Sequence, residues 1–179
     1  MWGRARTAPL FFVTRFLVHT VLVAGFSLAV TTASAVQLNT TAPDFSLKDL
    51  TGKAVYLKNY RGKALILNFW STTCPPCVSE MPALNKLYRD LAGEGLLVLG
   101  ISLDPGEKPV RDLLSRLHIE YPVLLDPAQE VYFDTYALFG QPVSIFIDRS
   151  GVVREKIVGP IDWDSQQMRA KVRNLLRGK

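Results

Sequence analysis

Apolar residues along this 179-residue chain form runs and periodic spacings that predict alternating strands and helices. The runs at 64–70 and 96–103 are almost entirely apolar, as expected for strands buried on both faces of a sheet. Apolar residues at helical spacing follow each run, in 81–91 and in 110–117. Two strand–helix units in succession predict a parallel arrangement at the centre of an α/β fold.

Shorter patterned segments surround this centre. They predict a hairpin around Thr51-Gly52 at 45–57, a short strand at 121–125 and a helical stretch at 129–136. Two strands joined by a turn follow at 143–158, and a closing helix at 168–176. The predicted fold is therefore a central mixed β-sheet with helices on both faces and an added N-terminal β-hairpin.

The first 35 residues have the pattern of a secretory signal peptide. Arginines occur early, no acidic residue precedes Asp44, and the apolar run 16–30 is followed by Ala33-Ser34-Ala35, a small-x-small cleavage pattern. An uncleaved N-terminal anchor is the alternative, although a membrane-spanning helix needs ~20 apolar residues. We expect a flexible lead at 36–43 and one domain at 44–179.

Charge gives little information about partners. Without the three arginines of the leader, the excess of basic over acidic residues falls from +5 to +2. The remaining chain has no cluster of lysine and arginine, so we expect no nucleic-acid partner. We expect a monomer in the bacterial periplasm or cell envelope, either soluble after cleavage or anchored by its N-terminus.

The only two cysteines carry the clearest chemistry in Cys74-Pro75-Pro76-Cys77, between a buried strand and a helix. This setting is typical of thiol–disulfide redox sites, because the helix N-terminus stabilises a thiolate. Cys74 is the candidate nucleophile, and Cys77, one turn inside the helix, can resolve a mixed disulfide on it. We expect Thr72 or Thr73 near the N-cap and both prolines in the first helical turn.

Two other uses of the cysteines are weaker. A structural disulfide that closes so short a ring removes little entropy from the unfolded chain. A zinc or copper site would need further soft ligands, and His118 is the only histidine after the leader. We expect His118 to be a solvated loop residue and expect no cofactor besides the redox-active disulfide.

Five further residues bear on the site. Gln141-Pro142 precedes a strand, where a cis bond would present the Gln141 backbone to an extended substrate, although an ordinary trans proline fits equally well. Glu80 could relay a proton or raise a thiol pKa, but a solvated glutamate on the helix face has the same spacing. Trp70 is expected in the core and at the rim of the site, and Asn68 within the strand needs a polar partner.

These residues resemble exported thioredoxin-fold thiol–disulfide oxidoreductases of the TlpA/ResA/CcmG type, from about Ala42 to the C-terminus. The motifs that carry the resemblance are Ala42-Pro43-Asp44-Phe45, Leu57-Lys58-Asn59-Tyr60-Arg61-Gly62-Lys63, Asn68-Phe69-Trp70, Cys74-Pro75-Pro76-Cys77, Glu80-Met81-Pro82, Gly140-Gln141-Pro142 and Ile145-Phe146-Ile147-Asp148. The resemblance implies a nucleophilic Cys74, a resolving Cys77, a cis Pro142 and an active-site role for Glu80.

The resemblance also implies reduction of disulfides in exported proteins such as apocytochrome c, with resupply from a membrane thiol donor of the DsbD/CcdA type. Family members usually carry tryptophan where this chain has Thr73, so the rim expected to contact substrate is smaller and more polar. That rim would comprise Trp70, Thr73, Pro75, Pro76 and Gln141. Cytoplasmic thioredoxins resemble one another in carrying a buried aspartate at the position of Asn68. Asparagine cannot take up a proton, so a proton relay here must use Glu80 or water.

Two other functions remain open at this point. The N-terminal half also resembles peroxiredoxins, because Ser71-x-x-Cys74 matches their Thr/Ser-x-x-Cys pattern. Leu67 stands where those enzymes carry proline, and Cys77 is too close for their usual resolving geometry. The third possibility is a copper-binding carrier that holds Cu(I) through the two sulfurs.

Overall fold

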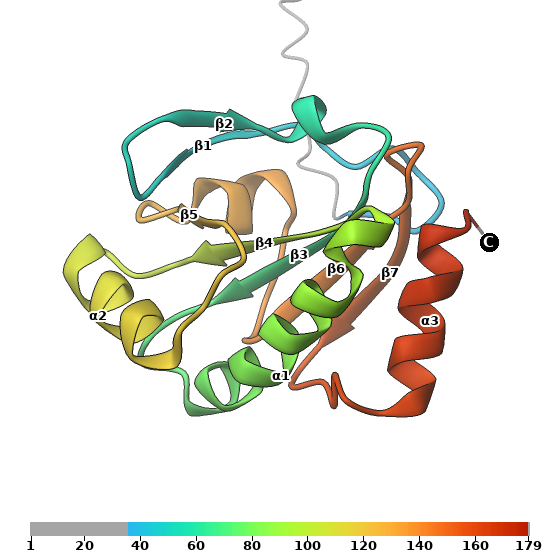
Figure 1. Ribbon diagram of the computed structural model, residues 1–179. Coiled ribbons are helices and arrows are strands. Elements are labelled where there is room, and N and C mark those ends of the chain that lie inside the picture. The colour runs from blue at the N-terminus through green and yellow to red at the C-terminus, as the bar shows by residue number, and fades with distance from the viewer. Residues whose placement is uncertain (1–35, 179) are drawn as a thin grey trace, which may run out of the picture. The chain divides into compact units, whose positions relative to one another are not determined.

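The computed structural model describes residues 36–178, which form a seven-stranded mixed sheet with helices (Figure 1). The strands are β1 Ser46–Asp49, β2 Ala54–Tyr56, β3 Ala64–Trp70, β4 Leu96–Ser102, β5 Val123–Leu125, β6 Val143–Ile147 and β7 Val153–Val158. The α-helices are α1 Pro75–Leu91, α2 Glu107–Leu117 and α3 Gln166–Leu176. Short helical turns are η1 Leu57–Tyr60, η2 Ala92–Glu94 and η3 Val131–Thr135.

The sheet has the strand order β2-β1-β5-β4-β3-β6-β7. β3, β4 and β5 run parallel and are joined through α1 and α2, while β6 and β7 form an antiparallel hairpin beside β3. Strands β3 and β4 are buried along their whole length, as their continuous apolar runs predict. Because β6 is antiparallel to β3, the end of β3 and the start of β6 meet at one edge of the sheet.

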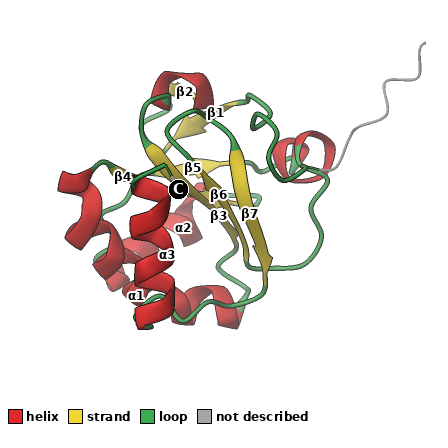
Figure 2. Cartoon of the chain, turned by 90° about the vertical axis from the view of Figure 1, so that its right-hand side faces the viewer, coloured by secondary structure: helices red, strands yellow, loops and turns green. Residues whose placement is uncertain are grey.

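The two faces of the sheet are covered differently. Figure 2 shows α1, α2 and α3 together on one side of the sheet. Their buried side chains form one core cluster with Ile66, Val98 and Phe146. The other face is covered by η3 and the segments around Phe45 and Leu57, whose side chains form the second cluster. Helices therefore lie on both faces, as predicted, but the second face has only the short helical turns η1 and η3.

Helix α1 begins with prolines at its first two positions and contains a third, Pro82, in its interior. The first two lack N–H groups that a helix N-terminus would leave unpaired in any case. Pro82 has no N–H to donate to the carbonyl of Val78, four residues earlier, so one hydrogen bond of the helix is missing there. None of the helices among residues 36–178 is both long and apolar enough to cross a bilayer.

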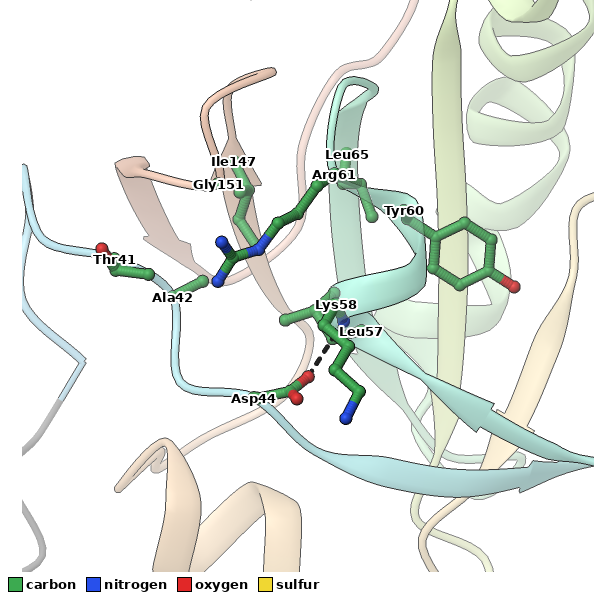
Figure 3. Close-up of a pocket in the computed structure, with 10 residues that line it drawn as sticks. All are labelled: Thr41, Ala42, Asp44, Leu57, Lys58, Tyr60, Arg61, Leu65, Ile147 and Gly151. Atoms are coloured by element: carbon green, nitrogen blue, oxygen red, sulfur yellow. Dashed lines mark hydrogen bonds between the residues drawn. The ribbon is translucent and has the colours of Figure 1, made fainter.

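The motifs around Asp44 and Lys58 have a structural role at the far end of β3 from the cysteines. The Asp44 carboxylate accepts the backbone N–H of Lys58 at 2.9 Å, and the N–H of Leu57 donates to the carbonyl of Phe45. Asp44, Leu57 and Lys58 line a cavity of about 30 Å³ together with Leu65, Ile147 and neighbouring residues (Figure 3). A cavity of this size holds a water molecule or two and no organic substrate.

The predicted signal peptide lies outside the described residues. Residues 36–42, expected to be a flexible lead, are instead tied to the domain. The N–H of Val36 donates to Tyr136, that of Asn39 to Val153 and that of Ala42 to Gly151. Sequence reasoning missed these bonds because their acceptors lie more than 95 residues further along the chain.

Gly100 in β4 provides a test of how tightly the core beneath α1 is packed. A Cβ there would lie 2.9 Å from the Tyr121 ring and 3.1 Å from the Trp70 indole nitrogen. We expect Gly100→Ala to lower the free energy of unfolding by about 1–3 kcal/mol, measured by urea denaturation. Gly93→Ala is the matched control, since a Cβ at Gly93 meets nothing within 4 Å. Equal stability of the two variants would contradict this account.

Candidate active site

Strand β3 delivers the two cysteines to the edge of the sheet. A short turn follows Trp70, and the N–H of Cys74 donates to the carbonyl of Ser71 at 3.2 Å. Cys74 itself is the N-cap of α1, because the N–H of Cys77 donates to its Sγ at 3.3 Å. Thr73 directly precedes this cap, which agrees with the expectation of a threonine near the N-cap, although the capping atom is the cysteine sulfur. A sulfur at the N-cap lies at the positive end of the helix dipole, and the only N–H of the first three helical residues, that of Cys77, donates to it.

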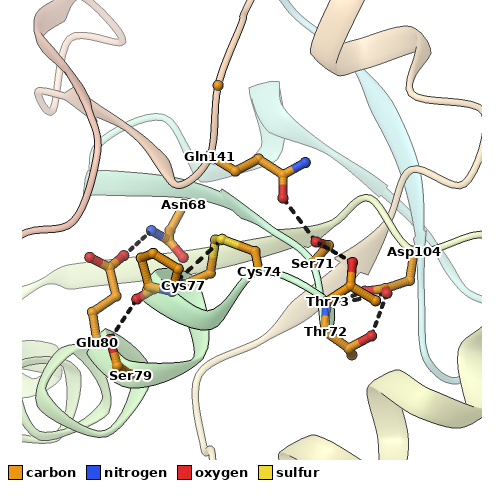
Figure 4. Close-up of a disulfide and its surroundings, with 12 residues drawn as sticks. Asn68, Ser71, Thr72, Thr73, Cys74, Cys77, Ser79, Glu80, Asp104 and Gln141 are labelled. Atoms are coloured by element: carbon orange, nitrogen blue, oxygen red, sulfur yellow. Dashed lines mark hydrogen bonds between the residues drawn. A yellow bond between two sulfur atoms is a disulfide. The ribbon is translucent and has the colours of Figure 1, made fainter.

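The cysteines form a disulfide with an S–S distance of 2.07 Å (Figure 4). Cys77 is 1% exposed, whereas Cys74 is half-buried and can be reached from solvent. This difference in access is what a nucleophile and its resolving partner require, since the incoming disulfide must meet one sulfur first.

Glu80 is buried behind the disulfide and is not a solvated residue of the helix face. It is 6% exposed, and its carboxylate accepts the Asn68 amide N–H at 3.0 Å and the Ile161 backbone N–H at 2.8 Å (Figure 4). The Asn68 amide also donates to the Ser144 hydroxyl at 3.0 Å, which supplies the partner that Asn68 needs. Three separate segments thus meet at one carboxylate.

Burial raises the pKa of Glu80 above its ordinary value of 4.5, and the hydrogen bonds from Ile161 and Asn68 only partly oppose this. Burial likewise raises the pKa of Tyr121, with a smaller contribution from the Glu80 charge. The Trp163 side chain also lowers the pKa of Glu80, although its indole nitrogen makes no hydrogen bond of ordinary geometry within residues 36–178. Burial therefore disfavours the charged form of Glu80, while polar neighbours partly offset this.

A second buried carboxylate, that of Asp104, lies on the other side of the disulfide (Figure 4). Asp104 follows β4, and its carboxylate accepts the Thr72 N–H at 2.9 Å, the Thr72 hydroxyl at 2.6 Å and the Ser102 hydroxyl at 2.8 Å. The turn that leads to Cys74 is thereby fixed to β4. Sequence reasoning missed this residue, although a carboxylate directly after a buried strand was a visible signal.

The Gln141–Pro142 peptide bond is cis, which confirms the geometry predicted for it. The Gln141 side chain accepts the Ser71 hydroxyl at 2.9 Å, which links the loop before β6 to the turn after β3 (Figure 4). Ser71 also lies 3.3 Å from the Thr73 hydroxyl. The Ser71 hydroxyl that prompted the peroxidase hypothesis is therefore engaged with Gln141 and Thr73.

Of the residues expected at the rim of the site, four are exposed and one is buried. Thr73, Pro75, Pro76 and Gln141 are exposed around the disulfide, where a substrate could contact them. Trp70 is 0% exposed, so its expected place at the rim and its contact with substrate are wrong. Its bulk fills the core above Gly100.

His118 caps the C-terminus of α2 in a left-handed backbone conformation. Its side chain is exposed, and the residue is distant from the cysteines in the sequence. Within residues 36–178, no group of three or more His, Cys, Asp or Glu residues is arranged to hold a metal ion.

The raised pKa of Glu80 predicts how stability depends on pH. The folded state binds this proton more tightly than the unfolded state, so the stabilisation is present at acid pH and is lost as pH rises from about 4.5 through the raised pKa. Glu80→Gln lacks this titration. We expect its free energy of unfolding, minus that of the wild type, to increase over this range.

Urea denaturation of the oxidised proteins at a series of pH values measures this difference. Glu94→Gln, which removes an exposed carboxylate, is the control. A difference between Glu80→Gln and wild type that stayed constant with pH would show that Glu80 has an ordinary pKa.

The Asp104 contacts predict a cost to stability. Asp104→Ala leaves the Thr72 N–H and hydroxyl and the Ser102 hydroxyl without their acceptor, which should lower the free energy of unfolding by about 1–3 kcal/mol. Asp112→Ala is the control, because its ion pair with Lys108 is exposed and should contribute less than about 1 kcal/mol. Thermal unfolding compares the two, and equal midpoints would refute the anchoring role.

Comparison with known proteins agrees with this geometry. The profile of the AhpC/TSA family matches residues 38–156. The chain is 37% identical to the thiol-disulfide oxidoreductase ResA of Bacillus cereus over 123 residues, which is 69% of this chain and 70% of ResA. It is 36% identical to ResA of Geobacillus thermodenitrificans over 129 residues, 72% of this chain and 74% of that protein.

A solved structure shows the same architecture. The thiol:disulfide interchange protein, thioredoxin family protein from Chlorobium tepidum superposes with a TM-score of 0.65 and 31% identity, over 80% of this chain and 98% of that one. The thioredoxin-like fold, the accessible and buried cysteines and these similarities lead to one assignment. The chain belongs to the AhpC/TSA family and is a thioredoxin-fold thiol–disulfide oxidoreductase of the ResA type.

Proposed function

We propose that this protein reduces disulfide bonds in exported proteins, using the Cys74–Cys77 dithiol as the electron source. The observation that carries the proposal is the unequal access of the two sulfurs, with Cys74 at the N-cap of α1 and Cys77 buried one turn later. The disulfide is the oxidised end of this cycle, and no other redox group takes part.

In the first step the Cys74 thiolate attacks one sulfur of the partner disulfide. A mixed disulfide forms, and the second partner sulfur leaves as a thiolate that takes up a proton. The Cys77 N–H, which donates to Cys74 Sγ, and the first turn of α1 stabilise the attacking anion.

In the second step Cys77 loses its proton and attacks Cys74 Sγ. This releases the remaining partner sulfur as a thiol and closes the Cys74–Cys77 disulfide, so two electrons have passed to the partner. In its ionised form, Glu80 supports this step as proton acceptor, since it lies one turn beyond Cys77 and burial makes its carboxylate a stronger base by raising its pKa.

The Gln141 backbone is well placed to hold an extended substrate. Its N–H and carbonyl make no backbone hydrogen bond to another described residue, while the neighbouring Pro142 carbonyl accepts from Gly159 at 2.8 Å. We assign these two free groups to pairing with the partner chain beside its disulfide. Thr73, Pro75 and Pro76 complete the contact surface.

The leader pattern of residues 1–35 supports action in the periplasm or cell envelope. Disulfides persist in that compartment, so continued reduction requires a source of electrons. A membrane thiol donor of the DsbD/CcdA type would reduce the Cys74–Cys77 disulfide again. The substrate proposed on the basis of the family is apocytochrome c or another exported protein with a disulfide.

Separate cysteine variants test the order of events. Cys74→Ser should abolish reduction of insulin, because no accessible nucleophile remains. Cys77→Ser should complete only the first step and accumulate a covalent complex with its substrate, visible on a non-reducing gel. Ser79→Ala, an exposed change in the same turn of α1, should behave as wild type.

Insulin reduction by Cys74→Ser at the wild-type rate would disprove the assigned nucleophile. The rate of hydrogen peroxide consumption in the presence of a recycling thiol distinguishes the peroxidase hypothesis from disulfide reduction. We expect a rate no faster than that of free cysteine, and a much faster rate would favour peroxidase activity.

A further inference from the structure

Three large apolar side chains are exposed together beside the cis-proline loop. Phe139 is 75% exposed, Val158 57% and Phe133 46%, and they come from three separate segments of the chain. Within residues 36–178 only Leu38 and Tyr56 are other large apolar residues of comparable exposure. Folding leaves such side chains in water at a cost, so a cluster of them marks a contact surface.

Two of the three side chains are neighbours of each other, and the third adjoins the residue after Phe139. The ring centroids of Phe133 and Phe139 are 6.2 Å apart, and Tyr132 packs edge-on against Phe133 at 4.9 Å. Val158 lies at the other side, where its Cγ1 is 3.2 Å from the position of a Cβ on Gly140. We call Phe133, Phe139 and Val158 the apolar shelf.

The shelf is held rigid and joined to the redox site. The Tyr132 hydroxyl donates to the Gly140 carbonyl, and the N–H of Gly159 donates to the Pro142 carbonyl, so both sides of the shelf are bonded to the loop 140–142. Gln141 in that loop is hydrogen-bonded to Ser71, three residues before Cys74 (Figure 4). A chain that pairs with the Gln141 backbone while its sulfur meets Cys74 would lie beside Phe139, which is two residues before Gln141 in the same loop.

We propose that the apolar shelf binds the segment of a substrate protein next to its disulfide, and selects segments that carry a large apolar side chain there. The proposal rests on the proposed function, because the occupant is the chain undergoing exchange at Cys74. No charged residue occurs at 139–141 or 158–160, and the nearest charge next to a shelf residue is the exposed Asp134 beside Phe133, so the surface between the loop and Phe139 favours an apolar partner. The rim has Thr73 where family members usually carry tryptophan, so it offers less apolar contact, and the shelf supplies such contact instead.

Two synthetic peptides test this selection. Each carries one cysteine blocked as a mixed disulfide with a chromogenic aromatic thiol, and the cysteine is flanked by leucines in one peptide and by serines in the other. The reduced protein displaces the coloured thiol in its first step. We expect wild type to react several-fold faster with the leucine peptide.

Phe139→Ser should remove this preference by slowing the leucine peptide roughly fivefold to tenfold, with the serine peptide unchanged. Val158→Ser, on a different element, should act in the same direction. Tyr56→Ser is the matched control, since Tyr56 is 41% exposed on β2, outside the shelf, and its loss should leave the preference intact.

A small symmetric aromatic disulfide, which is too short to reach the shelf, separates the two proposals. If Phe139→Ser reacts normally with it and loses the preference, the shelf proposal stands. If Phe139→Ser keeps the wild-type preference, the shelf proposal is wrong while the redox chemistry stands. If wild type fails with the small disulfide and both peptides, the proposed function is wrong.

Sedimentation equilibrium tests the competing occupant, a second copy of this chain. We expect a monomer for both wild type and Phe139→Ser. A wild-type dimer that Phe139→Ser dissociates would overturn the proposal and assign the shelf to self-association.

Discussion

The carboxylate of Glu80 is the interaction on which the geometry of the site depends. It joins α1, the Asn68 side chain of β3 and the backbone of Ile161 after β7. A buried carboxylate with too few hydrogen-bond donors would destabilise the fold. The position of each of these segments therefore depends on the positions of the other two. The same burial raises the pKa of Glu80, and structure and proton chemistry therefore share one cause.

The disulfide lies between two buried carboxylates that differ in their surroundings. Asp104 receives three hydrogen bonds, two of them from Thr72, and fixes the turn that carries Cys74. Glu80 receives two hydrogen bonds, from Asn68 and Ile161, and its burial raises its pKa. The first carboxylate fixes the position of the nucleophile, and the second is suited to exchange a proton. Two residues of similar chemistry are thus adapted to different tasks by their environments.

Much of this architecture could be predicted from the sequence because its determinants are local. The apolar runs of β3 and β4 require burial on both faces, and two prolines after Cys74 suit only the start of a helix. The order of strand, turn and cysteines then fixes the site at the sheet edge. The cis bond before Pro142 followed from the resemblance to a known family rather than from its position.

The remaining features depend on contacts between distant segments. The donor to Glu80 Oε2 lies 81 residues away, so spacing alone could not distinguish a buried Glu80 from a solvated one. Trp70 ends a strand whose neighbours cover it completely, and no local pattern separates such a residue from a rim residue. The tethered lead 36–42 was missed for the same reason, because its partners come from β7 and η3 and their flanking turns.

The interior proline of α1 has a mechanical consequence. Without the N–H of Pro82, the turn that contains Val78 and the cysteines is coupled less strongly to the rest of the helix, where Leu84, Leu87 and Leu91 hold it in the core. Opening and closing the ring between the two sulfurs can therefore shift that turn alone. The buried leucines of α1 can then stay packed while the turn that bears the cysteines adjusts.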